Sequence, residues 1–251
     1  MPKVFIVLST ALLLSCNDDL QSKLFPKTKE VAITNPTKEK TDRRKRSEDY
    51  CQKHEVPVYK NPNALFTDPE SQIVIRTKDE IVDRALALCY IGLKSEGFKK
   101  DILEKVEERY TISSKLTPSE KSYVNSISPT EQQTTDANWR YESLHVMLWA
   151  LGFVDSLTFP DKICKVEEDT RSIRNHTEAE FRQKARLRSK KEILDQADLI
   201  LRLNWACTNA RIKNEPAPGH LDYSVVYERH YAFNWLIRYL DQNWDDVSTD
   251  T

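Results

Sequence analysis

Glycine is scarce in this sequence, with four residues in a chain of 251. Tight turns of all-β folds and phosphate-binding loops both depend on glycine, because it adopts backbone conformations that other residues avoid. Neither a GxGxxG motif nor a Walker-type loop occurs. The scarcity favours a helical fold and excludes these two nucleotide-binding loops.

An excess of either charge is also missing. The chain has 38 basic and 39 acidic side chains, for a formal net charge of −1. No overall field therefore attracts nucleic acid or an anionic membrane, and any partner must be recognised locally. No GxSxG elbow or ordered Ser-His-Asp set is present either. The sequence predicts no nucleic-acid partner and no cofactor.

The cysteines show no metal-binding spacing. Those at positions 51, 89, 164 and 207 form no CxxC pair and no regular Cys/His pattern. Cys89 and Cys207 lie on apolar helix faces and are predicted to be buried thiols. A disulfide between Cys51 and Cys164 is compatible with an oxidising compartment, and the spacing does not decide it.

Long hydrophobic runs are absent except at the amino terminus, where Val4 to Leu14 are apolar or small. This run is too short for a permanent membrane span and suits the core of a signal peptide. Its end, LLSC, resembles the bacterial lipobox, in which cleavage leaves a lipid-modified cysteine, here Cys16. An apolar first helix is the alternative, but a polar segment follows at once. We therefore expect a signal peptide over residues 1–15 and an envelope lipoprotein anchored through the Cys16 lipid.

Residues 16–50 are predicted to be a flexible polar tether, because they have too few large apolar side chains to offset the entropy of ordering. The basic run Arg43 to Arg46 has the composition of a nucleic-acid patch, but we interpret it as a solvated part of the tether. Asn17 is not the aspartate associated with inner-membrane retention, so the expected location is the outer membrane.

Residues 51–251 are predicted to be one mainly α domain, with one or two short edge strands before the first helix. Capping boxes, in which a Ser or Thr and a Glu three residues later cap a helix start, occur four times, at Thr77, Thr117, Ser128 and Ser189. The last one opens the segment Ser189 to Lys213, whose broad apolar face indicates a central helix packed on more than one side. Further helices are expected over 99–110, 177–188 and 222–241.

Three segments resemble a known family: WRYESLHVMLWALG, LILRLNWACTNARI, and VVYERHYAFNWLIRY with the closing WDDVSTDT. They are similar to the domain of unknown function 4272, and the likeness extends over about Thr77 to Thr251. The family has no established activity, so the resemblance implies a fold and no catalytic residues. The lipobox and tether are an addition in front of it.

Four residues are the candidates for a site. Glu142 and His145 have the Glu-x-x-His spacing that di-iron bundles use, but they use it twice and this chain has one copy. Glu228 and His230 lie on the last long helix, where with Arg229 they could face a pocket beside the central helix. The plainer interpretation pairs Glu142 with an arginine such as Arg140 and makes both histidines packing residues.

Other patterns are weaker. Asp245, Asp246 and Asp250 loosely resemble a magnesium cluster, and capping or pairing with arginines is the simpler role.

The leading functional hypothesis is a membrane-tethered binding or interaction module. One alternative is a metal-assisted enzyme, which requires Glu142, His145, Glu228 and His230 to converge on one cleft. Another is an immunity-type inhibitor with a dedicated protein partner.

Overall fold

The computed structural model describes residues 36–61 and 66–251, and these residues form nine α-helices and no strand. The predicted mainly α domain is confirmed. The short edge strands expected around Val56-Val58 and Ile73-Ile75 are absent from this part of the chain, where both pairs lie in irregular backbone between two helices. Residues 1–35 and 62–65, with the predicted signal peptide and Cys16, lie outside the described residues.

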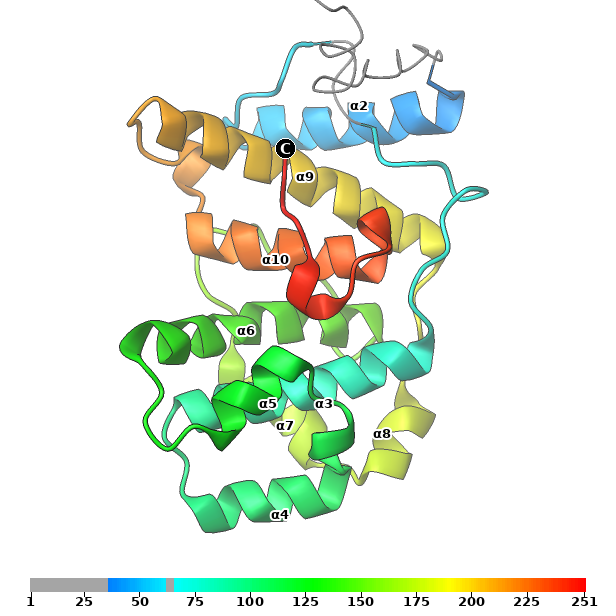
Figure 1. Ribbon diagram of the computed structural model, residues 1–251. Coiled ribbons are helices and arrows are strands. Elements are labelled where there is room, and N and C mark those ends of the chain that lie inside the picture. Colours follow the sequence, from blue (N-terminus) through cyan, green and yellow to red (C-terminus); the bar gives the residue numbers. More distant parts are fainter. Residues whose placement is uncertain (1–35, 62–65) are drawn as a thin grey trace, which may run out of the picture. The chain divides into compact units, whose positions relative to one another are not determined.

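The helices follow one another along the chain, and the longest connections precede the helices that start at Lys78 and Val166 (Figure 1). Their bounds are α2 Lys38–Lys53, α3 Lys78–Ser95, α4 Lys100–Tyr110, α5 Pro118–Asn125, α6 Glu131–Ala150, α7 Val166–Arg174, α8 Glu178–Lys184, α9 Lys190–Ile212 and α10 Tyr223–Leu236.

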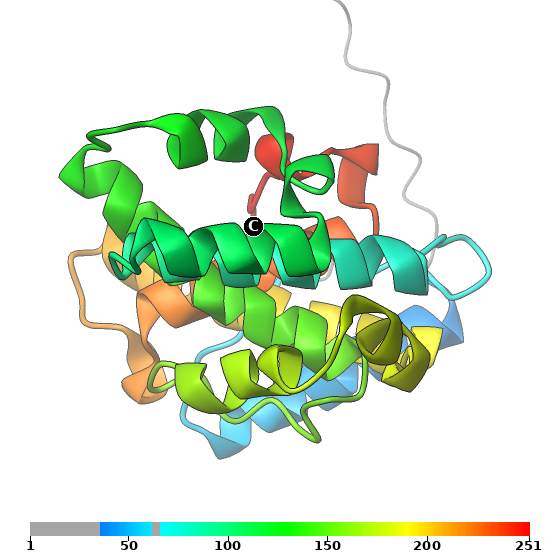
Figure 2. The same ribbon diagram turned by 90° about the horizontal axis from the view of Figure 1, so that it is seen from below.

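Six of these helices form a stack whose spatial order differs from the chain order. Each helix contacts the next in the series α2, α9, α10, α6, α3 and α4, which Figure 1 shows from top to bottom. The view from below shows α4 and α5 on one side of α6 and α7 and α8 on the other (Figure 2). Because α9 lies between α2 and α10, the predicted packing of this helix on more than one side is confirmed.

Helix starts follow local side-chain chemistry. Capping boxes with both reciprocal hydrogen bonds are present at Thr77, Thr117 and Ser189, as predicted. The box expected at Ser128 was assigned two residues too early, since Thr130 caps α6 together with Gln133. A fifth box, at Thr177, starts α8.

The tether prediction was wrong for residues 38–50. They form most of α2, which packs against α9. Arg43, expected to be solvated, is 1% exposed and binds Glu39 at 2.6 Å and Asp195 at 3.2 Å. Its guanidinium also donates to the carbonyls of Thr67 and Asp68. Charge pairing, not apolar periodicity, attaches this polar helix to the domain.

The last long helix is shorter than predicted. It ends at Leu236, and Arg238 and Leu240 both adopt left-handed backbone conformations with φ of 53°. The chain then turns back, and Trp244 inserts against the stack with 4% exposure. The Trp244 ring meets Tyr231 and Trp235 edge-on, at centroid distances of 5.0 and 5.5 Å.

The tightest helix contact joins α3 and α6. A Cβ placed on Gly92 would lie 2.4 Å from ring atoms of Tyr141. Only glycine permits this approach, because any other residue would overlap the ring. In the part of the chain that the structure describes, no helix is both long and apolar enough to span a bilayer.

Candidate functional site

Two of the four candidate residues, Glu142 and Glu228, lie in the interface between α6 and α10. Glu142 accepts a hydrogen bond from Arg229 Nε at 3.1 Å, and Glu228 accepts one from Arg140 at 3.1 Å. Glu142 is therefore paired with an arginine, as the plainer interpretation expected, but this arginine is Arg229 and not the suggested Arg140. Each helix contributes one acid and one arginine, so the two ion pairs cross the interface in opposite directions.

Glu228 is almost fully buried, and its surroundings act on the pKa of its carboxyl in opposite directions. Burial raises the pKa of its carboxyl, while the Arg140 guanidinium and the Ser143 hydroxyl oppose that rise. Ser143 Oγ donates to Glu228 Oε2 at 2.9 Å. A carboxylate held by two donors in a packed interface supports the contact between helices, since a lone buried charge would be costly.

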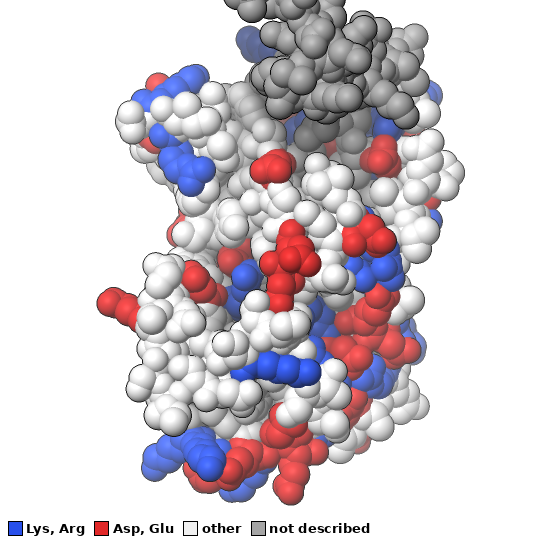
Figure 3. Space-filling model, viewed as in Figure 1, with Lys and Arg blue, Asp and Glu red and all other residues white. Residues whose placement is uncertain are grey.

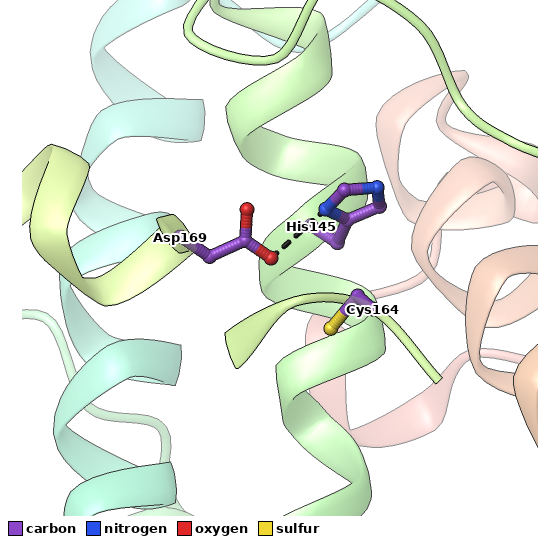
Figure 4. Close-up of side chains that lie close together, drawn as sticks. All are labelled: His145, Cys164 and Asp169. Atoms are coloured by element: carbon purple, nitrogen blue, oxygen red, sulfur yellow. Dashed lines mark hydrogen bonds and ion pairs between the residues drawn. The ribbon is translucent and has the colours of Figure 1, made fainter. Parts of the chain in front are cut away.

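His145 has partners of a different kind. Its Nδ1 lies 2.8 Å from Oδ2 of Asp169 in α7, and the side chains are 12% and 3% exposed. Cys164, just before α7, completes a cluster in which one potential ligand atom from each residue lies within 4.8 Å of the others. Figure 4 shows the Asp169 carboxylate pointing at His145, with the Cys164 sulfur turned to the side of the carboxylate.

Cys164 is held in place by Glu142. The backbone N–H of Cys164 donates to Glu142 Oε1, and the thiol contacts the carbonyl of Tyr141 at 3.6 Å. Burial raises the pKa of this thiol, and the Glu142 and Asp169 carboxylates raise it further. Glu142 of the predicted Glu-x-x-His pair therefore positions Cys164, whereas His145 of the same pair is bound by Asp169.

This cluster does not have the arrangement of a cysteine nucleophile. In a catalytic triad the imidazole lies between nucleophile and carboxylate. Here the second ring nitrogen of His145 points away from Asp169, and the sulfur lies on the carboxylate side (Figure 4). Activated cysteines have a lowered pKa, whereas that of Cys164 is raised. The three side chains instead present imidazole, thiol and carboxylate donors to a shared point.

His230 lines a separate cavity of about 200 Å³, together with residues of α9, of α10, of the C-terminal segment and of the segment before α3. It is 1% exposed, and its Nδ1 has no hydrogen-bond partner among the described residues. Burial lowers the pKa of the imidazole to about 4, so it is neutral at pH 7. The apolar wall is formed by Phe66, Ile73, Ala197, Leu201 and Ile237.

The rim of this cavity combines polar groups with an unusual backbone. Asp68, Asp250 and Arg238 line it, and Nε of Arg238 is buried without a described partner. Arg238 and Leu240, which also line it, are the residues with left-handed φ. Strained backbone and unsatisfied polar atoms at one place are typical of ligand sites.

The structure therefore separates the four candidates. Glu142 and Glu228 share the α6–α10 interface, His145 faces α7, and His230 lines the cavity beside α9. The convergence that the metal-assisted enzyme required does not occur. Glu228 and Arg229 do not line the His230 cavity, so the three residues do not share this pocket.

Asp245 has the structural role that was the simpler of its two interpretations. Asp245 accepts hydrogen bonds from Thr117 Oγ1 and Ser119 N at the start of α5, which is the capping role. Cys51 and Cys164 are free thiols, and Cys89 and Cys207 are buried as predicted. Cys164 and Asp169 were missed as partners of His145, because the short helix that carries Asp169 was not predicted and both residues are distant from His145 in the sequence. The acidic start and basic end of α7 were the available signal.

The model of the family described as "Domain of unknown function (DUF4272)" matches residues 43–247. The chain belongs to this family. The DUF4272 match begins inside α2, in agreement with the packing of that helix on α9. It includes His145, Cys164, Asp169 and His230, and excludes Cys16 and Asp250. No curated protein and no solved structure matches the chain.

Proposed function

We propose that this DUF4272 domain is a binding module that holds a small, uncharged amphipathic molecule in the His230 cavity. The observation that carries the proposal is the Nδ1 atom of a nearly fully buried histidine at the wall of a 200 Å³ cavity, which has no hydrogen-bond partner within residues 36–61 and 66–251. A buried polar atom without a partner costs free energy, and a ligand hydroxyl or carbonyl would supply the missing hydrogen bond.

The apolar wall and the rim charges define the ligand class. Side chains such as Leu201 and Ile237 favour a hydrocarbon body, as in most small-molecule pockets. Arg238 is already paired with Glu80 at 2.9 Å, and Asp68 and Asp250 stand at the rim. These acids disfavour an anionic ligand, while the neutral imidazole provides one hydrogen bond and no charge.

We further propose that the chain carries this module at a bacterial envelope membrane, through lipid on Cys16 and most simply at the outer membrane. The lipobox-like LLSC and the short apolar run before it support the anchor. The immunity-type alternative would require a protein partner in place of the small ligand.

The ligand proposal is tested with the full chain and a panel of phenol, indole and 1-hexanol, each with an apolar body and one hydrogen-bonding group. Saturation-transfer NMR reports which compound binds. We expect at least one to bind to the wild type and to lose binding in Ala197→Leu, which places a larger side chain in the cavity. Ala210→Leu, on the same helix outside the cavity, is the matched control and should bind normally.

A panel without any binder, or equal binding to both leucine variants, would contradict the small-ligand proposal. Recovery of one dedicated protein at equal stoichiometry, together with an inert cavity, would favour the immunity-type alternative. The anchor is tested separately by fractionating cells that produce the wild type or Cys16→Ser. We expect the wild type in the membrane fraction and the serine variant outside it, whereas identical distributions would exclude lipid attachment at Cys16.

A further inference from the structure

We propose that His145, Cys164 and Asp169 form a binding site for a divalent transition-metal ion of the zinc type. The site is independent of the His230 cavity. It rests on the convergence of three different donor side chains from two helices and the loop between them (Figure 4).

The distances are close to those that such an ion requires. Tetrahedral zinc with nitrogen or oxygen ligands at about 2.0 Å and sulfur at about 2.3 Å separates its ligand atoms by about 3.3–3.5 Å. The three donor atoms already lie within 4.8 Å of one another, and Nδ1 and Oδ2 are 2.8 Å apart. Binding therefore needs the nitrogen and oxygen to separate by about 0.5 Å and the sulfur to approach, which side-chain rotation can provide.

The donor types select the class of ion. Thiolate with imidazole favours zinc and related ions over calcium or magnesium, which prefer all-oxygen sites. The ion replaces the thiol proton: a sulfur–metal bond forms, the S–H bond breaks, and the proton leaves to solvent. With one thiolate and one carboxylate, the two negative charges of the site balance those of a divalent cation.

The surroundings hold these donors in place before any ion binds. The backbone of Cys164 is fixed by Glu142, which is itself held by Arg229. Asp169 is in the first turn of α7, so its backbone position is set by the helix that starts two residues after Cys164. Such outer contacts orient the ligands of protein metal sites. Three protein ligands leave a fourth position, which solvent can reach because Cys164 is only half-buried.

The test uses the full chain, reduced and freed of metal, titrated with Co²⁺ as a spectroscopic substitute for Zn²⁺. We expect one equivalent to produce a sulfur-to-cobalt charge-transfer band with the visible spectrum of a four-coordinate ion, and Zn²⁺ to abolish both. This measurement needs no variant. Absence of a charge-transfer band at one equivalent would overturn the proposal.

Variants identify the ligands. Cys164→Ala should lose the band, and Asp169→Asn should weaken Co²⁺ binding by at least about tenfold. Cys207→Ala, which removes a buried thiol elsewhere, is the matched control and should keep the band. Retention of the band in Cys164→Ala, or its loss in Cys207→Ala, would assign the metal to another cysteine and refute the site. Circular dichroism of each variant verifies that it is folded, and His145→Asn, which should also weaken Co²⁺ binding, replaces a ligand variant that is not.

Discussion

At the residue scale, the structure gives several polar side chains roles that depend on burial. His230 is the clearest case, because it keeps a neutral imidazole inside the protein with a pKa lowered to about 4. The negative charge of Asp250 favours the protonated imidazole and so raises its pKa, but the effect of burial is larger. Protonation of this histidine is therefore easier in the unfolded chain than in the folded one.

This difference predicts a loss of stability in mild acid. Between the unfolded pKa of about 6.5 and the folded pKa of about 4, the unfolded state binds more protons, so the free energy of unfolding rises with pH. We expect full stability above pH 6.5 and a loss of about 2 kcal/mol by pH 5, measured by urea unfolding.

The control is His230→Phe, whose unfolding free energy should change less over the same range. Glu228, with its raised pKa, acts in the opposite direction and is present in both proteins, so their difference isolates the histidine. An equal pH dependence in the two proteins would show that His230 keeps an ordinary pKa.

Gly92 makes a second prediction at this scale. Alanine would favour the helix by about 1 kcal/mol at an unconstrained position. Here its Cβ would overlap the Tyr141 ring, so we expect Gly92→Ala to destabilise the protein by about 1–3 kcal/mol. The double variant with Tyr141→Leu should show a favourable coupling in denaturant unfolding. Simple additivity of the two changes would mean that the ring is not the obstacle.

At the element scale, helix starts were predictable and helix attachments were not. Capping chemistry is local, so Thr77, Thr117 and Ser189 could be assigned from a few residues each. α2 could not, because KEKTDRRKRSEDYCQK has no apolar stripe. Its burial depends on arginine pairs with residues far away in the chain. The partners of His145 were missed for the same reason, since Asp169 is 24 positions away.

Two arginines of α2 give a matched test of this attachment. Both bind Asp195, but Arg43 is 1% exposed at its side chain and Arg46 is 51% exposed. We expect Arg43→Ala to cost about 2–4 kcal/mol because it removes a buried side chain and the donor to the carbonyls of Thr67 and Asp68, and Arg46→Ala to cost less than about 1 kcal/mol. Thermal and urea unfolding measure both. Similar small effects would show that α2 is only loosely joined to α9.

At the scale of the whole molecule, the predicted helical class and the family are confirmed, and the structure adds the order in which the helices stack. The series α2, α9, α10, α6, α3 and α4 could not be derived from the pattern, because equally apolar helices can stack in many orders. On the face shown in Figure 3, acidic and basic side chains lie interspersed, in keeping with a net charge of −1. Recognition by this molecule therefore depends on local sites.

The C-terminal residues stabilise the stack as a whole. Trp244 is 4% exposed, lies against α10, and has the Arg84 guanidinium of α3 over its ring. We expect Trp244→Ala to lower the free energy of unfolding by about 3–5 kcal/mol. Trp205→Ala, at a half-exposed tryptophan of α9, should cost clearly less. If urea unfolding gave equal losses, Trp244 would be an ordinary surface contact.

The placement of α10 and Trp244 also bears on how the protein is made. A ribosome synthesises the chain from the amino end, and domains fold as soon as their complete units emerge. Here α10 lies between α6 and α9 but follows both of them in the chain. The stack of helices therefore cannot close before α10 has been synthesised.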